Sequence, residues 1–509
     1  MSTSPSSPPA PAGSLIRSFP RVFWVANVME LFERAAYYGL NSVLAVYLTA
    51  PTSKGGLGFG ESAVGFLQSL IYACNYVVPI LGGALADRYG YRRMLLVSFS
   101  MLAAGYFASG HMSTYGTVFA CLLVMAAGGG LFKPIISGTI ARTTTEASSG
   151  FGFGVYYWMI NVGAFAAPLV ISYLKGRPDF AWRMIFTVSS VYCALMLLPA
   201  VTVWRDPPRP ETTKRFSEVA RGAATVLGDA RFMLMIVVYS IFWILYFQNF
   251  GTVLWFLRDF IDPTPANQLF AALGLKLRFD AEFVTVVNGG TIILLQVLVS
   301  RVVKDWPPLR TMVAGIAIGA VGFLCLAFAR HVGMFVLGIA IFSIGEMTAH
   351  PKYYSYVGLV APPDKKAVYM GYAFLYGVFG SLIGSSGGGS LYGAWLKPLA
   401  GTEAGRAAAQ RFWLLFVALD VAAVVGLLLY DRLFAKDTPR ANAQARVAMQ
   451  GVYGVLVLSG LVFVWRALTG EEISWKTLVQ ASIFVLLGIG GLVVIARRRR
   501  REAAAALGR

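Results

Sequence analysis

Apolar runs of about 20 residues alternate along the chain with short polar segments rich in Lys, Arg, Gly and Pro. A helix of that length crosses the hydrocarbon core of a bilayer. The pattern therefore predicts about fourteen membrane-spanning helices. They lie near residues 22–48, 62–85, 94–112, 116–140, 153–174, 182–203, 232–256, 283–303, 310–329, 333–359, 367–395, 410–430, 448–468 and 476–496.

The first of these runs contains the polar stretch "ELFERAAYYG" at residues 30–39. Its polar side chains have the spacing of a single helical face: Glu30, Glu33, Arg34, Tyr37, Tyr38 and Asn41. An ionisable side chain at the bilayer centre costs about 2.5–3.5 kcal/mol, so this face should meet the protein interior or a water-filled cavity. A purely structural pairing of Glu33 with Arg34 is the alternative, but it leaves one carboxylate without a partner.

Two further spans carry ionisable residues away from their ends. The stretch "AAGGGLFKPIISG" places Lys133 beside three glycines that allow close helix packing. The stretch "IGEMTAHPKYYSYVG" contains Glu346, His350 and Lys352. Lys352 lies near a predicted helix end and can reach the membrane surface, whereas Lys133 lies far from either end. Lys133 and Glu346 are therefore functional candidates by position, and His350 is a weaker one.

Composition supports the membrane assignment. The chain of 509 residues is 57% hydrophobic and 13% charged, whereas soluble proteins are about 25% charged. Its net charge of +19 concentrates on one side of the predicted topology, including Arg88, Arg92, Arg93 and the run 497–501. Because cytoplasmic loops are enriched in Lys and Arg, both termini are predicted to be cytoplasmic. This topology explains the basic charge without a nucleic-acid partner. The four cysteines lie in apolar runs and indicate neither disulfides nor a metal site.

Four motifs resemble one transporter family. The stretch "ELFERAAYYG" resembles the ExxERxxYYG motif of the proton-dependent oligopeptide transporters, the peptide branch of the major facilitator superfamily. The stretch "YYWMINVGA" at residues 156–164 resembles their FYxxINxG motif. The stretch "GGALADRYGYRR" resembles the loop between spans two and three of the whole superfamily. "GEMTAHP" resembles the family pattern in span ten. The resemblance covers roughly residues 20–430.

The resemblance implies an all-α membrane protein of two six-helix halves around a central site, here followed by an extra pair of transmembrane helices. The expected segments are a disordered tail at 1–15, an N-terminal half at 16–204, a cytoplasmic linker at 205–231, a C-terminal half at 232–431, a linker with the extra helix pair at 432–496, and a basic cytoplasmic tail at 497–509.

The resemblance also implies roles for individual residues. Proton coupling is expected at Glu30, Glu33 and Glu346. Substrate binding is expected at Arg34, Tyr37, Tyr38, Tyr76, Lys133, Asn161, Asn288 and Glu346. Arg34 and Lys133 would bind a peptide carboxylate, and Glu346 would face the amino end. Lys133 and Glu346 are further expected to pair across the halves and close the cytoplasmic gate.

Two positions depart from the family pattern. Relatives often have an arginine where this chain has Asn41. They usually have an acid four residues after the tryptophan that corresponds to Trp243, and Phe247 stands there. These two charges form an extracellular gate in the family. Because both charges are absent, neither is left without a partner. Their absence still makes ordinary di- and tripeptide specificity an open question. Asp420 in span twelve has no family counterpart and is expected to have a packing or hydrogen-bonded role.

The sequence therefore predicts a proton-driven symporter of the bacterial inner (plasma) membrane that imports di- and tripeptides. It is expected to work as a monomer in the lipid bilayer, with the proton gradient as its energy source and no cofactor or metal. A modified peptide, an amino-acid derivative or another small anion is the alternative cargo, and a non-transporting sensor is the alternative class. An enzyme is not expected, because P-loop, HExxH and GxSxG motifs are lacking in a suitable context.

Overall fold

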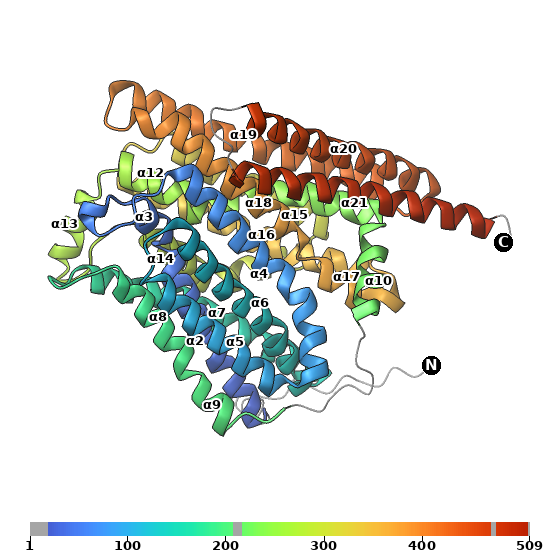
Figure 1. Cartoon of the computed structure of the whole chain (residues 1–509), viewed down its shortest axis with the longest axis horizontal. Helices are drawn as coiled ribbons and strands as arrows, with labels where there is room; N and C mark the ends of the chain where they lie inside the picture. The colour runs from blue at the N-terminus through green and yellow to red at the C-terminus, as the bar shows by residue number, and fades with distance from the viewer. Residues whose placement is uncertain (1–18, 207–215, 470–474, 507–509) are drawn as a thin grey trace.

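The computed structural model describes residues 19–206, 216–469 and 475–506. These residues form α-helices that are connected mostly by short loops (Figure 1). The predicted N-terminal tail at 1–15 lies outside these residues. Twelve helices in the described part are long and apolar enough to cross a membrane. Two more correspond to predicted spans, α2 (Arg21–Asn41) and α5 (Tyr91–Ser109). Charges within α2 and two arginines at the start of α5 make them less apolar. The prediction of an all-helical membrane protein is confirmed.

Two six-span bundles form the body of the protein. The helices of the first bundle are α2 with α3 (Leu44–Thr49), α4 (Glu61–Tyr89), α5, α6 (Tyr115–Thr143), α7 (Glu146–Lys175), and α8 (Arg183–Leu195) with α9 (Leu197–Thr202). The helices of the second are α11 (Ala230–Tyr246) with α12 (Thr252–Phe260), α14 (Phe283–Val303), α15 (Pro308–Ala327), α16 (Val332–Val360), α17 (Lys366–Tyr372) with α18 (Leu375–Leu391), and α19 (Glu403–Phe434).

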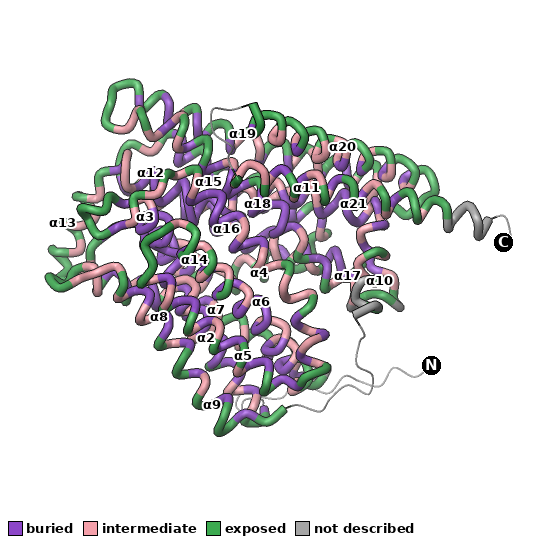
Figure 2. The backbone as a smooth tube through the Cα atoms, viewed as in Figure 1, coloured by how far each residue is buried: buried purple, intermediate pink, exposed green. Residues whose placement is uncertain are grey.

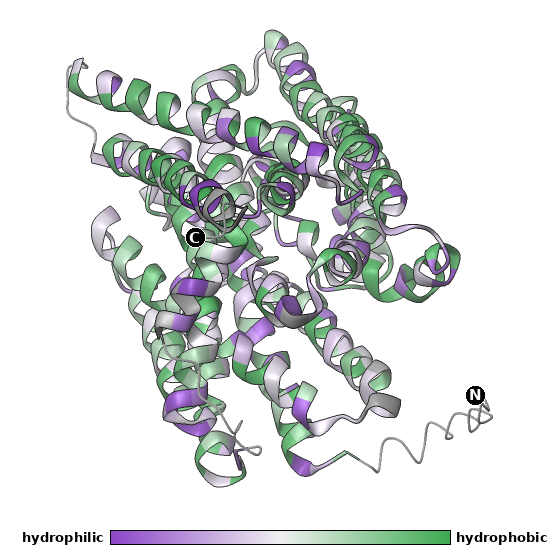
Figure 3. Cartoon of the chain, turned by 90° about the vertical axis from the view of Figure 1, so that its right-hand side faces the viewer, coloured by the Kyte–Doolittle hydropathy of each residue, from purple (hydrophilic) through white to green (hydrophobic). Residues whose placement is uncertain are grey.

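The two bundles meet along two helix pairs, α4 with α18 and α7 with α14. Glycines allow the first pair to approach closely. A Cβ atom added at Gly65 would collide with the Ser385 carbonyl oxygen and lie 2.9 Å from the Gly389 Cα. Small residues bring membrane helices into backbone contact in this way. Buried residues concentrate along the interior of both bundles, and the outer surfaces are largely hydrophobic (Figures 2 and 3).

Two elements lie outside the bundles. The short helix α10 (Phe216–Leu227) belongs to the predicted linker and packs against α17, α4 and α21. The extra helices α20 (Pro439–Thr469) and α21 (Trp475–Ala506) pack against each other along one side of the molecule (Figure 1). We call the end of the bundles that carries α10 and α17 the linker end. The end that carries α3, α12 and the short helix α13 (Thr264–Ala272) is the opposite end.

Several predicted spans are not continuous helices, and side-chain hydrogen bonds explain two of the breaks. The span expected at 22–48 breaks after Asn41, where the Ser42 hydroxyl donates to the Gly39 carbonyl at 2.7 Å. The span expected at 232–256 passes through the 3₁₀ turn η2 (Phe247–Phe250). There Gln248 Nε2 donates to the Ile244 and Gly384 carbonyls at 2.6 and 3.0 Å. Such bonds compete with the helical ladder. Hydropathy cannot detect these breaks because the residues around them stay apolar.

Candidate functional site

The charged groups of α2 form one compact, buried cluster. Arg34 donates to both oxygens of Glu33, with Nε 2.5 Å from Oε2 and Nη2 2.7 Å from Oε1. Glu30 lies farther away, 3.6 Å from the same Arg34 Nε. Its Oε2 is buried and has no hydrogen-bond partner among the described residues. The charge of Arg34 is therefore neutralised mainly by Glu33. Glu30 is the carboxylate that accepts no hydrogen bond from Arg34.

Lys133 lies in the middle of α6, next to Pro134. Its ammonium group donates to the Asn75 carbonyl of α4 at 3.3 Å and lies 5.3 Å from the centre of the Tyr76 ring. A cation over an aromatic face is stabilised by the negative charge density of the ring. Lys133 makes no ion pair with the described residues, so its charge faces an open space beside the α2 cluster.

Glu346 provides the acid on the other bundle. Its Oε2 accepts a hydrogen bond from Asn288 Nδ2 of α14 at 3.0 Å. The same Asn288 nitrogen lies 2.9 Å from the Ser343 hydroxyl oxygen, one turn earlier on α16. These two bonds fix the side chains of Asn288 and Glu346 relative to each other. The Glu346 carboxylate makes no ion pair with the described residues.

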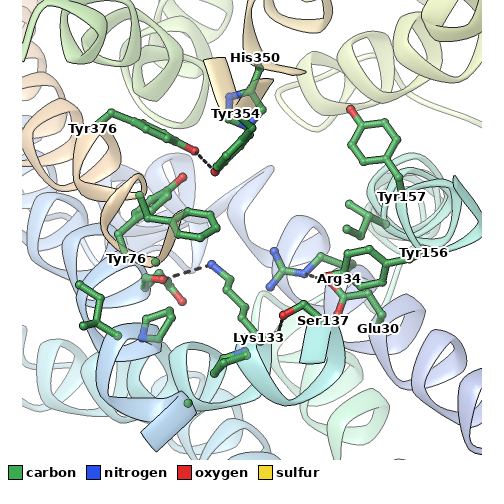
Figure 4. A pocket seen from close by; sticks show the side chains of 18 of the residues that line it. Glu30, Arg34, Tyr76, Lys133, Ser137, Tyr156, Tyr157, His350, Tyr354 and Tyr376 are labelled. Carbon is green, nitrogen blue, oxygen red and sulfur yellow. Dashed lines mark hydrogen bonds and ion pairs between the residues drawn. The ribbon is translucent and has the colours of Figure 1, made fainter. Parts of the chain in front are cut away.

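These groups line one cavity of about 960 Å³ between the two bundles. Figure 4 shows Lys133 and Arg34 on one wall, with His350, Tyr354 and Tyr376 across the cavity. At the linker end the lining reaches Asp87 and Glu218, so helix α10 contributes to the mouth. Of the residues predicted for the site, the lining includes Glu30, Arg34, Tyr38, Tyr76, Lys133, Asn161, Asn288 and Glu346.

Three predicted features lie outside the cavity lining or are not formed in this conformation. Tyr37 does not line the cavity; the Arg34 guanidinium carbon lies 4.7 Å from the centre of its ring. Glu33 lies behind Arg34 and also stays out of the lining. The pair of Lys133 with Glu346, expected for gate closure, is not formed here. Each side chain bonds to a neighbour in its own bundle. The cavity is open between them in this conformation.

The two departures from the family pattern, Asn41 and Phe247, are bridged by Tyr72 of α4. The Tyr72 hydroxyl donates to Asn41 Oδ1 at 2.9 Å, and its ring stacks on Phe247 with 5.2 Å between ring centres. Gln68 adds a bond to the Phe250 carbonyl at 2.7 Å. Asn41 and Phe247, the two predicted gate positions, are therefore linked through the Tyr72 side chain. Tyr72 connects the two helices at the place where the resemblance implies an ion pair.

Two ion clusters join the bundles at the opposite end. In the first, Arg258 of α12 donates to Thr49 Oγ1 at 2.6 Å and to Glu61 Oε1 at 3.2 Å. In the second, Lys175 of α7 contacts Asp280 and Glu282 just before α14, at 2.5 and 2.8 Å. Each cluster contains residues from both bundles. Together with the Tyr72 contacts, they close the opposite end of the cavity.

Sequence reasoning missed much of the aromatic wall. The cavity lining also includes aromatic residues that are not among the predicted site residues: Trp243, Tyr156, Tyr157, Tyr246, Tyr354 and Tyr376. The doubled tyrosines "YYW" and "KYY" were the available signal, but tyrosine is also common at membrane interfaces. Asp420, for which the sequence predicts a packing or hydrogen-bonded role, fits the packing role in the structure. It is fully buried outside the cavity, and neither of its carboxylate oxygens has a hydrogen-bond partner among the described residues.

Two helical bundles around a central cavity, lined by aromatic residues and a few charged groups, define a secondary transporter fold. The Major Facilitator Superfamily profile matches residues 31–385, and the chain belongs to this family. Among bacterial relatives, the "Uncharacterized transporter YclF" of Bacillus subtilis (strain 168) is 29% identical over 164 residues, 32% of this chain and 33% of that protein. The "Dipeptide and tripeptide permease A" of Escherichia coli (strain K12) is 30% identical over 178 residues, 34% of each. The matches thus span about a third of the relatives' length.

Solved structures share the fold over most of the chain. A crystal structure of the peptide transporter POT in complex with sulfate has a TM-score of 0.66 and 18% identity, covering 83% of this chain and 99% of that chain. A POT family transporter in complex with 5-aminolevulinic acid has a TM-score of 0.63 and 20% identity, covering 82% and 98%. These two likenesses show that the chain shares their fold. The family and fold are those of transporters.

Proposed function

We propose that the protein is a proton-coupled symporter that imports small peptides, chiefly di- and tripeptides, across the bacterial inner membrane. The observation that carries this proposal is the distribution of charge in the cavity: Arg34 and Lys133 on the wall of one bundle, Glu346 on the wall of the other. A short peptide is a zwitterion, so its carboxylate and its ammonium group fit opposite walls. The volume also falls within the usual range of about 300–1,000 Å³ for small-molecule sites.

Proton coupling follows from the contacts of Arg34. While Glu33 is ionised it holds two of the guanidinium N–H groups. A proton on Glu33 weakens these bonds and frees Arg34 for a peptide carboxylate. Proton binding and peptide binding then favour each other. This linkage is what symport requires, because a ligand shifts an equilibrium only through its differential affinity for the two states.

The transport cycle would alternate the two ends of the cavity. We assign the linker end to the cytoplasm, in line with the basic segments found there. The structure then represents the inward-open state, with the opposite end closed by Tyr72 and the two ion clusters. Closing the linker end would bring Lys133 and Glu346 together once the peptide has left. Such a pair would stabilise the empty, outward-open state.

A second cargo class is an amino-acid derivative or a modified peptide. The observation that favours it is the apolar contact of Tyr72 with Phe247 at the closed end, where the resemblance implies a pair of charges. A related solved structure is a complex with 5-aminolevulinic acid, which also carries an ammonium group and a carboxylate. Competition between alanyl-alanine and such a derivative for uptake would rank the two classes.

The proposed site is tested with the variants Lys133→Ala and Glu346→Ala in proteoliposomes. We expect each to lose most of its alanyl-alanine uptake, because each removes the wall charge that binds one end of the zwitterion. Lys304→Ala and Glu403→Ala are matched controls, since both residues are exposed outside the cavity. Uptake at the wild-type rate in either cavity variant would contradict the proposed site.

A further inference from the structure

His350 is a cavity residue whose chemistry the proposed transport mechanism does not use. It lies on α16 four residues after Glu346, so the two side chains share a helical face about 5–6 Å apart at Cβ. Its ring makes edge contacts with Trp243, Tyr354 and Tyr376, at 5.0, 5.1 and 5.7 Å between ring centres. Three aromatic rings from α11, α16 and α18 thus fix the orientation of the imidazole.

The buried hydroxyl of Tyr239 determines which ring nitrogen carries the proton. This hydroxyl lies 3.2 Å from His350 Nδ1, and Tyr239 is fully buried. If the hydroxyl donates to Nδ1, its proton is satisfied. If Nδ1–H donates instead, the hydroxyl proton is left buried without an acceptor, which costs about 1–3 kcal/mol. The first arrangement is favoured, and it places the imidazole proton on Nε2.

The Nε2–H group is available to a substrate. This nitrogen makes no hydrogen bond with the described residues, and it is not one of their buried polar atoms without a partner. His350 lines the cavity beside Tyr354 and Tyr376 (Figure 4). The wall therefore presents a neutral hydrogen-bond donor one turn beyond the Glu346 carboxylate, framed by aromatic rings.

We propose that His350 selects peptides whose amino-terminal residue carries a neutral, planar hydrogen-bond acceptor, namely the carboxamide of Gln or Asn. This rests on the proposed function, in which the peptide ammonium group binds near Glu346. The first side chain then reaches the imidazole, and its carbonyl oxygen accepts from Nε2–H. A carboxylate at the same place would lie close to Glu346, and the like charges disfavour it. An apolar side chain would leave the Nε2–H group without a partner.

The test compares three near-isosteric dipeptides as inhibitors of alanyl-alanine uptake: glutaminyl-alanine, methionyl-alanine and glutamyl-alanine. For the wild type we expect glutaminyl-alanine to inhibit about 3- to 10-fold more strongly than methionyl-alanine, as one neutral hydrogen bond allows. In His350→Phe, which keeps a ring but lacks the donor, the methionyl-to-glutaminyl IC50 ratio should fall to about 1.

Tyr239→Phe provides a second variant, in which the imidazole stays but its tautomer is no longer fixed. Its methionyl-to-glutaminyl IC50 ratio should lie between the ratios of the wild type and His350→Phe. His111→Gln, an exposed histidine outside the cavity, should keep the wild-type ratio. Two results would overturn the proposal. One is a wild type that shows no preference for glutaminyl-alanine. The other is a methionyl-to-glutaminyl IC50 ratio that stays at the wild-type value in both His350→Phe and Tyr239→Phe.

Failure of the proposed function gives a different result. If the wild type does not accumulate alanyl-alanine under a proton gradient, peptide transport is refuted. The His350 proposal is then read from peptide-induced thermal shifts of the purified protein. A larger shift with glutaminyl-alanine than with methionyl-alanine, lost in His350→Phe, supports selection by His350. Equal shifts, or none with any of the three peptides, overturn it.

Discussion

Arg34 has two carboxylates within reach but makes hydrogen bonds with only one of them. Glu33 takes both bonds, while Glu30 lies 3.6 Å away with one oxygen unsatisfied. Of these three residues, Glu30 and Arg34 line the cavity and Glu33 does not. In the proposed function, a peptide carboxylate that enters the cavity competes with Glu33 for the guanidinium. Removing one partner from such a buried pair is costly, so the exchange needs a proton to replace the lost charge.

This competition predicts the behaviour of Glu33→Gln. The variant cannot take up or release a proton at this position, so gradient-driven accumulation should be lost. Exchange of peptide across the membrane without net proton movement should partly survive, because Arg34 and Lys133 remain. Counterflow and pH-driven uptake in the same proteoliposomes measure the two activities. Accumulation equal to that of the wild type would contradict this role of Glu33. Glu403→Gln is the exposed control.

At the residue scale the sequence predicted the charged centre but not its packing. Helical spacing placed Glu30, Arg34 and Tyr38 on one face, and all three line the cavity. The same spacing included Tyr37, whose ring instead packs against Arg34. A helical wheel defines a face only to within about a quarter turn. Whether a side chain meets the cavity or its neighbour depends on helix rotation, which is set by contacts with other helices.

At the scale of elements, the closed end of the cavity depends on how α2, α4 and η2 meet. The Tyr72 hydroxyl donates to Asn41 while its ring stacks on Phe247. Hydropathy predicted the spans but not this arrangement, because the helix breaks arise from hydrogen bonds of Ser42 and Gln248. The resemblance located the two family departures, but it could not show that a tyrosine from a third helix connects them.

Asn41→Ala and Tyr72→Phe should be coupled, because each removes the same hydrogen bond. Each variant alone should lower the thermal stability of the protein. The double variant should be less destabilised than the sum of the two, with a coupling of about 0.5–1.5 kcal/mol. A double-mutant cycle with Asn41→Ala and the remote Ser62→Ala should be additive. Additivity for Asn41 with Tyr72 would show that the bridge does not form in the membrane.

The Lys175 cluster predicts a pH dependence of stability. Burial alone would raise the pKa of Asp280, but the Lys175 ammonium group, together with its hydrogen bond, holds that pKa below its ordinary value. Burial does raise the pKa of Glu282. A carboxyl with a lowered pKa stabilises the folded state above its ordinary pKa, and this stabilisation is lost as the pH falls through the lowered value.

We therefore expect wild-type protein to be more stable than Asp280→Asn at pH 6. The difference in melting temperature should shrink as the pH falls below the ordinary Asp pKa of about 3.9. This difference is measured by thermal unfolding of the purified wild type and Asp280→Asn from pH 3 to pH 7. Asp305→Asn changes an exposed acid of a surface pair and should show little difference at any pH. A melting-temperature difference between wild type and Asp280→Asn that stays constant across this pH range would exclude an ionised pair of Asp280 with Lys175.

At the scale of the whole molecule, the sequence predicted two bundles and an extra helix pair, but not how the pair packs. Helix α21 lies over the boundary between the bundles. Its Ile483 and Leu487 pack against Ala73 of α4 and against Val378 and Leu382 of α18. The sequence also could not give the conformational state, because both ends of a transporter must be able to close. Contacts between side chains distant in sequence decide which end is closed.

The central claim is that opposite charges on the two bundles bind a peptide zwitterion and couple its transport to protons. Alanyl-alanine uptake into proteoliposomes under an inward proton gradient tests it most directly. We predict accumulation above the external concentration, its collapse when a protonophore is added, and competition by di- and tripeptides but not by N-acetylated, C-amidated ones. Equal uptake with and without the gradient, or equal inhibition by peptides that lack both end charges, would contradict the account.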